Sequence, residues 1–178
     1  LIMSILILII FLSTFGIKTN RFNNQISAQI KNINQNIEVS LKEVSIILDP
    51  FKFRFNVKTL GTKLKYNDKV IELENVKSKI SLKNLIDNKF SLTHLSISSK
   101  SLEIKNLISF FRLIKDNSQL FFLEKLIKKG YLIADIDIEF NEIGKIKENY
   151  NITGSVKDVK VDFFKKYTLE QLNFIFEI

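Results

Sequence analysis

The spacing of hydrophobic and polar residues divides the chain into successive segments, and the first is an unbroken apolar run. Residues 1–17 carry no charged side chain. As a helix rising ~1.5 Å per residue, this run spans about 25 Å, slightly less than the ~30 Å hydrocarbon core of a bilayer. A cleaved signal peptide needs small residues at its cleavage site, and the residues around Gly16 fit such a site poorly. We therefore favour an uncleaved transmembrane signal-anchor helix over residues 1–17, with a cleaved signal as the alternative.

The next segment, residues 18–36, is rich in Asn and Gln but keeps a helical period. Its apolar residues recur at steps of three and four and continue into the following segment: Phe22, Ile26, Ile30, Ile33 and Ile37. This spacing predicts an amphipathic juxtamembrane helix whose apolar stripe contacts lipid or the following sheet. A polar linker is the alternative.

From Ile37 onward the period changes to two, which is typical of half-buried β-strands. The phase slips at Lys42-Glu43, which predicts a β-bulge or a tight bend, and it slips again near Thr93-His94. Asp49-Pro50 ends one strand, and Asn67-Asp68 predicts a hairpin turn between Tyr66 and Val70. The segment therefore predicts many short antiparallel strands.

Alternation also predicts which side chains share a face of the sheet. The clearest strand covers residues 51–58, where apolar residues alternate with polar and cationic ones: Phe51, Phe53, Phe55 and Val57 form its apolar side. A later strand places Ile136, Ile138 and Phe140 on one side and Asp135, Asp137 and Glu139 on the other. The final residues, 172–178, alternate in the same way and include Phe174 and Phe176.

Two short helices are predicted to interrupt the strands. Leu107, Phe110, Phe111 and Ile114 form one apolar helix face. Asn117-Ser118 then breaks the chain and caps a second helix over residues 119–129, which we expect Gly130 to close.

These elements predict a mostly β protein: an N-terminal transmembrane helix followed by a curved antiparallel sheet, either a groove or an open sandwich, with two short inserted helices. The expected divisions are residues 1–17 for the anchor, 18–36 for the juxtamembrane helix or linker, and 37–178 for the β-rich domain. The chain opens on Leu1 and stops within an alternating run, so we expect it to be part of a longer protein, truncated at the C-terminus.

Composition narrows the chemistry that the chain offers. It contains no Cys and one His, so thiol chemistry is excluded and imidazole chemistry is limited to His94. The net charge is +8, but the lysines alternate with apolar residues instead of clustering, so we expect no nucleic-acid partner. Asp135, Asp137 and Glu139 have the spacing of any solvated strand face. We therefore predict no enzyme, no catalytic residue, no metal site and no cofactor.

Part of the sequence resembles the AsmA-like proteins of the Gram-negative envelope, of the YhdP and TamB type. The first similar stretch is the membrane helix, the amphipathic segment and the strands of residues 37–58. The second runs from residue 126 to residue 163, and its similarity lies in short motifs: Ile127-Lys128-Lys129-Gly130, Asp135-Ile136-Asp137-Ile138, Gly144-Lys145-Ile146-Lys147 and Thr153-Gly154-Ser155-Val156-Lys157-Asp158-Val159.

The resemblance implies an apolar β-groove that carries phospholipid between the inner and outer membranes. It also implies a single-pass protein of the bacterial inner membrane, anchored by residues 1–17, with its bulk in the periplasm and a possible periplasmic or outer-membrane protein partner. The expected lipid-facing residues are Phe51, Phe53, Phe55, Val57, Ile136, Ile138, Phe140, Phe174 and Phe176. The alternative is an anchored β-sandwich that acts as a scaffold or assembly factor through protein–protein interaction.

Overall fold

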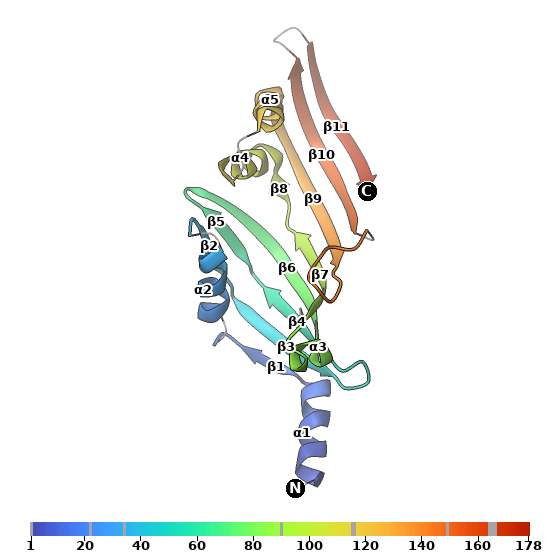
Figure 1. Cartoon of the computed structure of the whole chain (residues 1–178). Helices are drawn as coiled ribbons and strands as arrows, with labels where there is room; N and C mark the ends of the chain where they lie inside the picture. Colours follow the sequence, from blue (N-terminus) through green and yellow to red (C-terminus); the bar gives the residue numbers. More distant parts are fainter. Residues whose placement is uncertain are drawn as a thin grey trace.

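The computed structural model of the chain shows a long antiparallel sheet with helices on one side and an apolar helix projecting from one end (Figure 1). It describes residues 2–21, 23–33, 35–89, 91–114, 117–148, 150–163 and 167–178. The predicted fold class, mostly β and antiparallel with short helices, is confirmed for this part of the chain.

The main sheet is a meander whose strands lie side by side in chain order, β1-β3-β4-β6-β7-β9-β10-β11. All of its neighbouring pairs are antiparallel. The strands are β1 (Ile17–Thr19), β3 (Glu43–Asp49), β4 (Arg54–Leu60), β6 (Lys69–Ser81), β7 (Leu92–Ser99), β9 (Ile127–Glu139), β10 (Asn151–Phe163) and β11 (Tyr167–Glu177), with the short β8 (Leu102–Glu103) paired to β9.

A smaller sheet branches from β6. The first residues of β6 pair with β5 (Lys63–Tyr66), and β5 pairs with β2 (Ile37–Ser40), while β6 from Asn75 onward pairs with β4. The two-residue turn Asn67-Asp68 joins β5 to β6, with Asn67 in the left-handed region at φ 52° that such turns favour. This hairpin is the one that the sequence predicts.

The N-terminal helix α1 (Ile2–Thr14) is shorter than the predicted anchor over residues 1–17. It ends because Gly16, at φ 64°, turns the chain so that Ile17 pairs with Ile46 of β3. A Cβ on Gly16 would lie 2.6 Å from the carbonyl oxygen of Ile46, so the junction between helix and sheet is tight. Among the described residues no helix combines the length and the apolar character that crossing a bilayer requires.

The segment predicted as a juxtamembrane helix contains both β1 and a helix, α2 (Asn23–Ile33). α2 lies along β2, where Ser27 Oγ donates to the carbonyl of Val39 at 2.6 Å and Asn23 Nδ2 donates to the carbonyl of Leu41 at 2.8 Å. Of the predicted stripe, Phe22 and the side chains of Ile30 and Ile33 lie outside the described residues.

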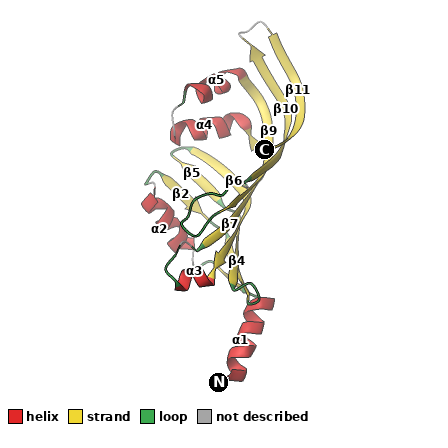
Figure 2. Cartoon of the chain, turned by 45° about the vertical axis from the view of Figure 1, so that its right-hand side comes forward, coloured by secondary structure: helices red, strands yellow, loops and turns green. Residues whose placement is uncertain are grey.

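The two inserted helices are α4 (Ile104–Ile114) and α5 (Ser118–Leu126), and both lie on one side of the sheet (Figure 2). Asn117 caps α5 as predicted, because its side-chain oxygen accepts from the backbone N–H of Gln119 at 2.7 Å. The two helices are joined by Glu124, which accepts hydrogen bonds from Ser109 and Arg112. The hydrogen bond from Ser109 and the Arg112 guanidinium lower the pKa of this carboxyl.

The core of the molecule lies where α4 crosses the sheets. Phe110 is 3% exposed and packs with Tyr66, Ile71 and Leu73 from the β5–β6 hairpin. The rings of Tyr66 and Phe110 meet edge to face, with their centroids 6.3 Å apart.

Two predictions about local structure are wrong, and one helix was not predicted. Residues 51–53 form a turn and not a strand, so β4 begins only at Arg54. The second inserted helix ends at Leu126, and Gly130 lies inside β9 at φ 147°, where a Cβ would lie 2.9 Å from Val159 Cγ2. A further short helix, α3 (Leu82–Ile86), follows β6 and is not one of the two inserted helices that the sequence predicts.

The phase slips correspond to real irregularities. At Lys42-Glu43 the chain passes from β2 in the smaller sheet to β3 in the main sheet, so the slip is a bend between two strands. Near Thr93 the register shifts between the pairs Lys79–His94 and Ile80–Leu92. Thr93 Oγ1 donates to the carbonyl of Lys79 at this point, at 3.0 Å.

Candidate functional site

The register of the main sheet gathers apolar side chains into rows on the side that carries α4 and α5. We call this side the apolar face. Its central row crosses five strands, from β3 to β9: Ile46, Val57, Ser78, Leu95 and Ile138. A second row lies nearer α4: Val44, Thr59, Val76, Ile97, Ile136 and Ile152. A third begins at Leu48, Phe55 and Ile80.

The helices close only part of this face. Val76 and Ile97 pack against the cluster around Phe110, and Val44 is 1% exposed. In the central row every apolar side chain is only half-buried, from Ile46 through Leu95 to Ile138. These side chains are shielded from some of the water but are not packed as a closed core would pack them. The central row is therefore an apolar strip that the described elements leave partly uncovered.

The apolar face continues toward β11. Gly154 of β10 lies under the ring of Phe176, since a Cβ on Gly154 would come within 2.6 Å of Phe176 Cζ. Phe174 lies opposite Val156 and is 52% exposed, whereas Val156 is 7% exposed. The last described strand thus presents aromatic side chains on the apolar face without covering them.

The structure divides the predicted lipid-facing residues into two groups. Phe55, Val57, Ile136, Ile138, Phe174 and Phe176 lie on the apolar face, and Phe140 follows directly after β9, bridged to Ile146. Phe51 and Phe53 lie apart from them in the β3–β4 turn, 99% and 52% exposed. The expectation that these two alternate with Phe55 on one strand is wrong, because Asp49 and Pro50 begin a turn that ends only at Arg54.

The opposite side of the sheet is mainly polar, although Ile47, Ile133 and Ile175 also lie on it. Its rows interleave with those of the apolar face, and one of them reads Ser45, Lys58, Lys77, Ser96, Asp137 and Asn151. A concavity of about 470 Å³ lies over this row. Asp137, predicted on a solvated face, is here 3.2 Å from His94 Nε2. Sequence reasoning missed this proximity, because residues 94 and 137 lie on strands whose pairing the alternation does not reveal.

The described residues contain no group of three or more His, Cys, Asp or Glu that could hold a metal ion. Among the described residues, the carboxyl group with the most strongly shifted pKa is Glu72 of β6, on the branch between the two sheets. Its carboxylate lies 2.6 Å from Lys63 Nζ and 2.9 Å from Lys100 Nζ. Hydrogen bonds from these two lysines lower the pKa of Glu72 to about 2. This group is an ion-pair clamp between β5, β6 and the residue after β7.

Comparison with protein-family models, with curated proteins and with solved structures finds no match to this chain.

Proposed function

We propose that the protein is attached to a membrane by α1 and that the apolar face of its sheet binds the acyl chains of phospholipid for transfer between the membranes of a Gram-negative envelope. The central row is the observation that carries this proposal. A half-buried apolar strip, from Ile46 to Ile138, is suited to a ligand that is itself a flexible hydrocarbon. Burial of such a chain is favourable by ~25 cal/mol per Å² and requires no directional group.

The character of α1 supports the membrane attachment. The helix is apolar on all sides, and none of its residues is buried by the rest of the chain. A helix that is apolar all round belongs in a protein core or in a bilayer. At ~1.5 Å per residue, its 13 residues extend about 20 Å, which reaches well into the ~30 Å hydrocarbon layer.

The placement of the bulk in the periplasm, and of the anchor in the inner membrane, rests on the resemblance to AsmA-like proteins. A reporter that is active only in the periplasm, fused after Ile178, is expected to be active and to fractionate with membranes. A soluble mature protein starting near Lys18 would contradict the anchor.

Lipid binding is tested by photo-crosslinking from the central row. A photoreactive residue at position 95 points to the apolar face, and the same residue at position 96 points to the polar face of the same strand. We expect lipid adducts from position 95 and few from position 96, detected by mass spectrometry after irradiation of native membranes. Adducts of equal yield at both positions, or none at either, would contradict the proposal.

A second function is favoured by one observation, the outer edge of β11. No described strand pairs with this edge, and Leu169, Phe174 and Ile175 on β11 are 48%, 52% and 86% exposed. Such an edge suits a scaffold that adds a strand from a protein partner. Protein adducts from a photoreactive residue at position 173, with no lipid adducts at position 95, would favour the scaffold.

A further inference from the structure

A second exposed apolar cluster lies at the end of the sheet from which α1 projects. We call it the basal patch, and it consists of Phe51 and Phe53 in the β3–β4 turn and Leu85 and Ile86 on α3. Their exposed fractions are 99%, 52%, 53% and 68%. The turn and the helix are in contact, because the backbone N–H of Leu82 donates to the carbonyl of Phe53 at 3.0 Å.

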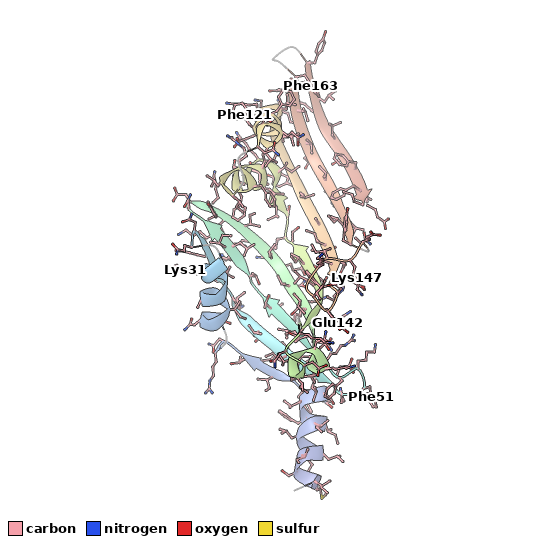
Figure 3. All side chains as sticks on the ribbon, in the orientation of Figure 1. Lys31, Phe51, Phe121, Glu142, Lys147 and Phe163 are labelled. Carbon is pink, nitrogen blue, oxygen red and sulfur yellow. The ribbon has the colours of Figure 1, made fainter. Side chains whose placement is uncertain are left out.

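The basal patch lies level with the end of α1. Ser13 in the last turn of α1 lines the same surface hollow as Pro50 and Phe51. Figure 3 shows Phe51 at the base of the sheet, beside the point where α1 begins to project. Because the Gly16 junction packs tightly on β3, helix and turn are held close together. If α1 enters a bilayer, the basal patch meets its surface.

The turn holds its phenylalanines outward in a fixed conformation. The carboxylate of Asp49 accepts from the backbone N–H of Lys52 and from Arg54 Nε, both at 3.1 Å. Phe53 has φ 46°, a left-handed conformation that is costly for a bulky side chain. In this conformation the turn leaves Phe51 in full contact with solvent, which is unfavourable for a large apolar group unless something covers it.

The charges around the basal patch indicate what covers it. Lys52 lies between the two phenylalanines in the sequence, and Lys83 is exposed on α3, three residues before Ile86 and therefore on a neighbouring part of the helix surface. Aromatic rings next to lysines suit the boundary of an anionic leaflet, where the rings enter the acyl region and the ammonium groups stay among the phosphates. The acids on this side are Asp49, Asp87 and Glu142; Asp49 is paired with Arg54 and Glu142 with Lys89, so Lys52 and Lys83 outnumber the remaining acid, Asp87.

We propose that the basal patch is a second membrane contact, in which the β3–β4 turn and α3 insert into the headgroup boundary of an anionic bilayer and fix the sheet upright on the membrane. This inference rests on the proposed membrane attachment through α1. Its consequence is a defined orientation: the apolar face, which starts at Leu48 and Phe55 just above the turn, opens directly next to the lipid surface.

The test uses probe quenching in the full chain. Because the chain has no cysteine, single cysteines at positions 6, 51, 85 and 175 can each carry an environment-sensitive fluorophore. The protein is reconstituted in vesicles of phosphatidylethanolamine and phosphatidylglycerol that contain lipids brominated either near the headgroup or near the chain end. Position 175 is the matched control, because Ile175 is 86% exposed on β11.

We expect the probes at positions 51 and 85 to be quenched by the shallow bromines, the probe at position 6 by the deep bromines, and the probe at position 175 by neither. Quenching at position 6 without quenching at 51 would overturn the basal contact and leave the anchor intact. Lack of quenching at position 6 would contradict the anchor itself. Shielding of position 51 that needs no vesicle and rises with protein concentration would assign the patch to a second copy and also overturn the proposal.

A charge variant tests the lipid chemistry separately. Lys52→Glu is expected to lower the equilibrium constant for docking at position 51, obtained from the docked and undocked fractions, by roughly fivefold or more, since each basic residue near an anionic surface contributes about that factor. Lys157→Glu is the control, because it makes the same change of charge at an exposed residue of β10, away from the basal patch. Equal quenching in both variants would refute the role of the anionic headgroups.

Discussion

A glutamate placed on the apolar face distinguishes a partly open strip from a closed core. We compare Leu95→Glu, in the half-buried central row, with Leu73→Glu, on the same face but 8% exposed within the cluster around Phe110. Each is paired with the corresponding glutamine variant, which has the same shape and no charge. The difference between Glu and Gln therefore reports the cost of the charge alone.

The expected magnitudes follow from burial. Complete burial of a leucine contributes ~1.5–3 kcal/mol, and an unpaired buried charge costs ~3–5 kcal/mol. Leu73→Glu loses the burial contribution and also incurs the cost of the buried charge. The sum is comparable to the ~5–15 kcal/mol that stabilises a typical domain, so we expect this variant to unfold. Leu95→Glu loses only part of the leucine term and its carboxylate keeps water, so we expect a loss of about 1–2 kcal/mol.

Unfolding in urea is monitored by far-UV circular dichroism, with the protein held in lipid nanodiscs at neutral pH. At position 95 the Glu and Gln variants are expected to agree within ~1 kcal/mol in the free energy of unfolding. At position 73 the Glu variant is expected to be much less stable than the Gln variant. A Glu–Gln difference as large at position 95 as at position 73 would refute the reasoning, because it would mean that the central row is closed.

Substitutions at three further positions test separate features of the fold. Gly154→Ala places a Cβ about 2.6 Å from both the carbonyl oxygen of Ile133 and the ring of Phe176, so we expect a loss of about 1–3 kcal/mol and faster hydrogen exchange in β11. The pKa of Glu72 is lowered from 4.5 to about 2, so its ion pairs stabilise the folded state above pH 4.5, and this contribution is lost as the pH falls toward 2. Glu72→Gln should therefore weaken the fall of the melting temperature between these pH values. An unchanged fall would contradict the ion-pair clamp. Asn117→Ala removes the cap of α5 and should cost about 1 kcal/mol in chemical unfolding, whereas Asn117→Ser should restore most of it.

Sequence reasoning predicts local features where one signal dominates. The turn at Asn67-Asp68 has both the residue types and the spacing of a hairpin, and the alternation around Ile136 and Asp137 gives the two faces of β9 correctly. Sequence reasoning fails where two local signals favour different structures. Phe51-Lys52-Phe53 alternates like a strand, but the Asp49 side chain accepts from the backbone of Lys52 and begins a turn.

The arrangement of the strands is not contained in any local pattern. Alternation assigns Val57 and Ile138 each to an apolar side, but the row that joins them depends on the register of β6 and β7 between them. The same holds for the contact between His94 and Asp137, which depends on the pairing of β7 with β9. The sequence does not predict α3, because a five-residue helix contains less than two turns and therefore shows no clear helical period.

The chain-order meander also determines how cooperatively the sheet opens. Along the main path each strand pairs with its immediate neighbours, and the further pairings of these strands are those of β6 with β5 and of β9 with β8, so no strand pairing joins one edge of the described sheet to the other. Stability in such a lattice is a sum of nearest-neighbour terms, as in stacked repeat proteins, and opening spreads inward from an edge instead of occurring all at once. β11 has one neighbour, whereas β6 is bonded to β4, β5 and β7 and shares its flanks with the cluster around Phe110. The free energy of opening should therefore rise stepwise from β11 through β10 and β9 to β6. We expect β6, where the two sheets branch, to be the most stable strand, while the β10–β11 hairpin opens without unfolding of the rest.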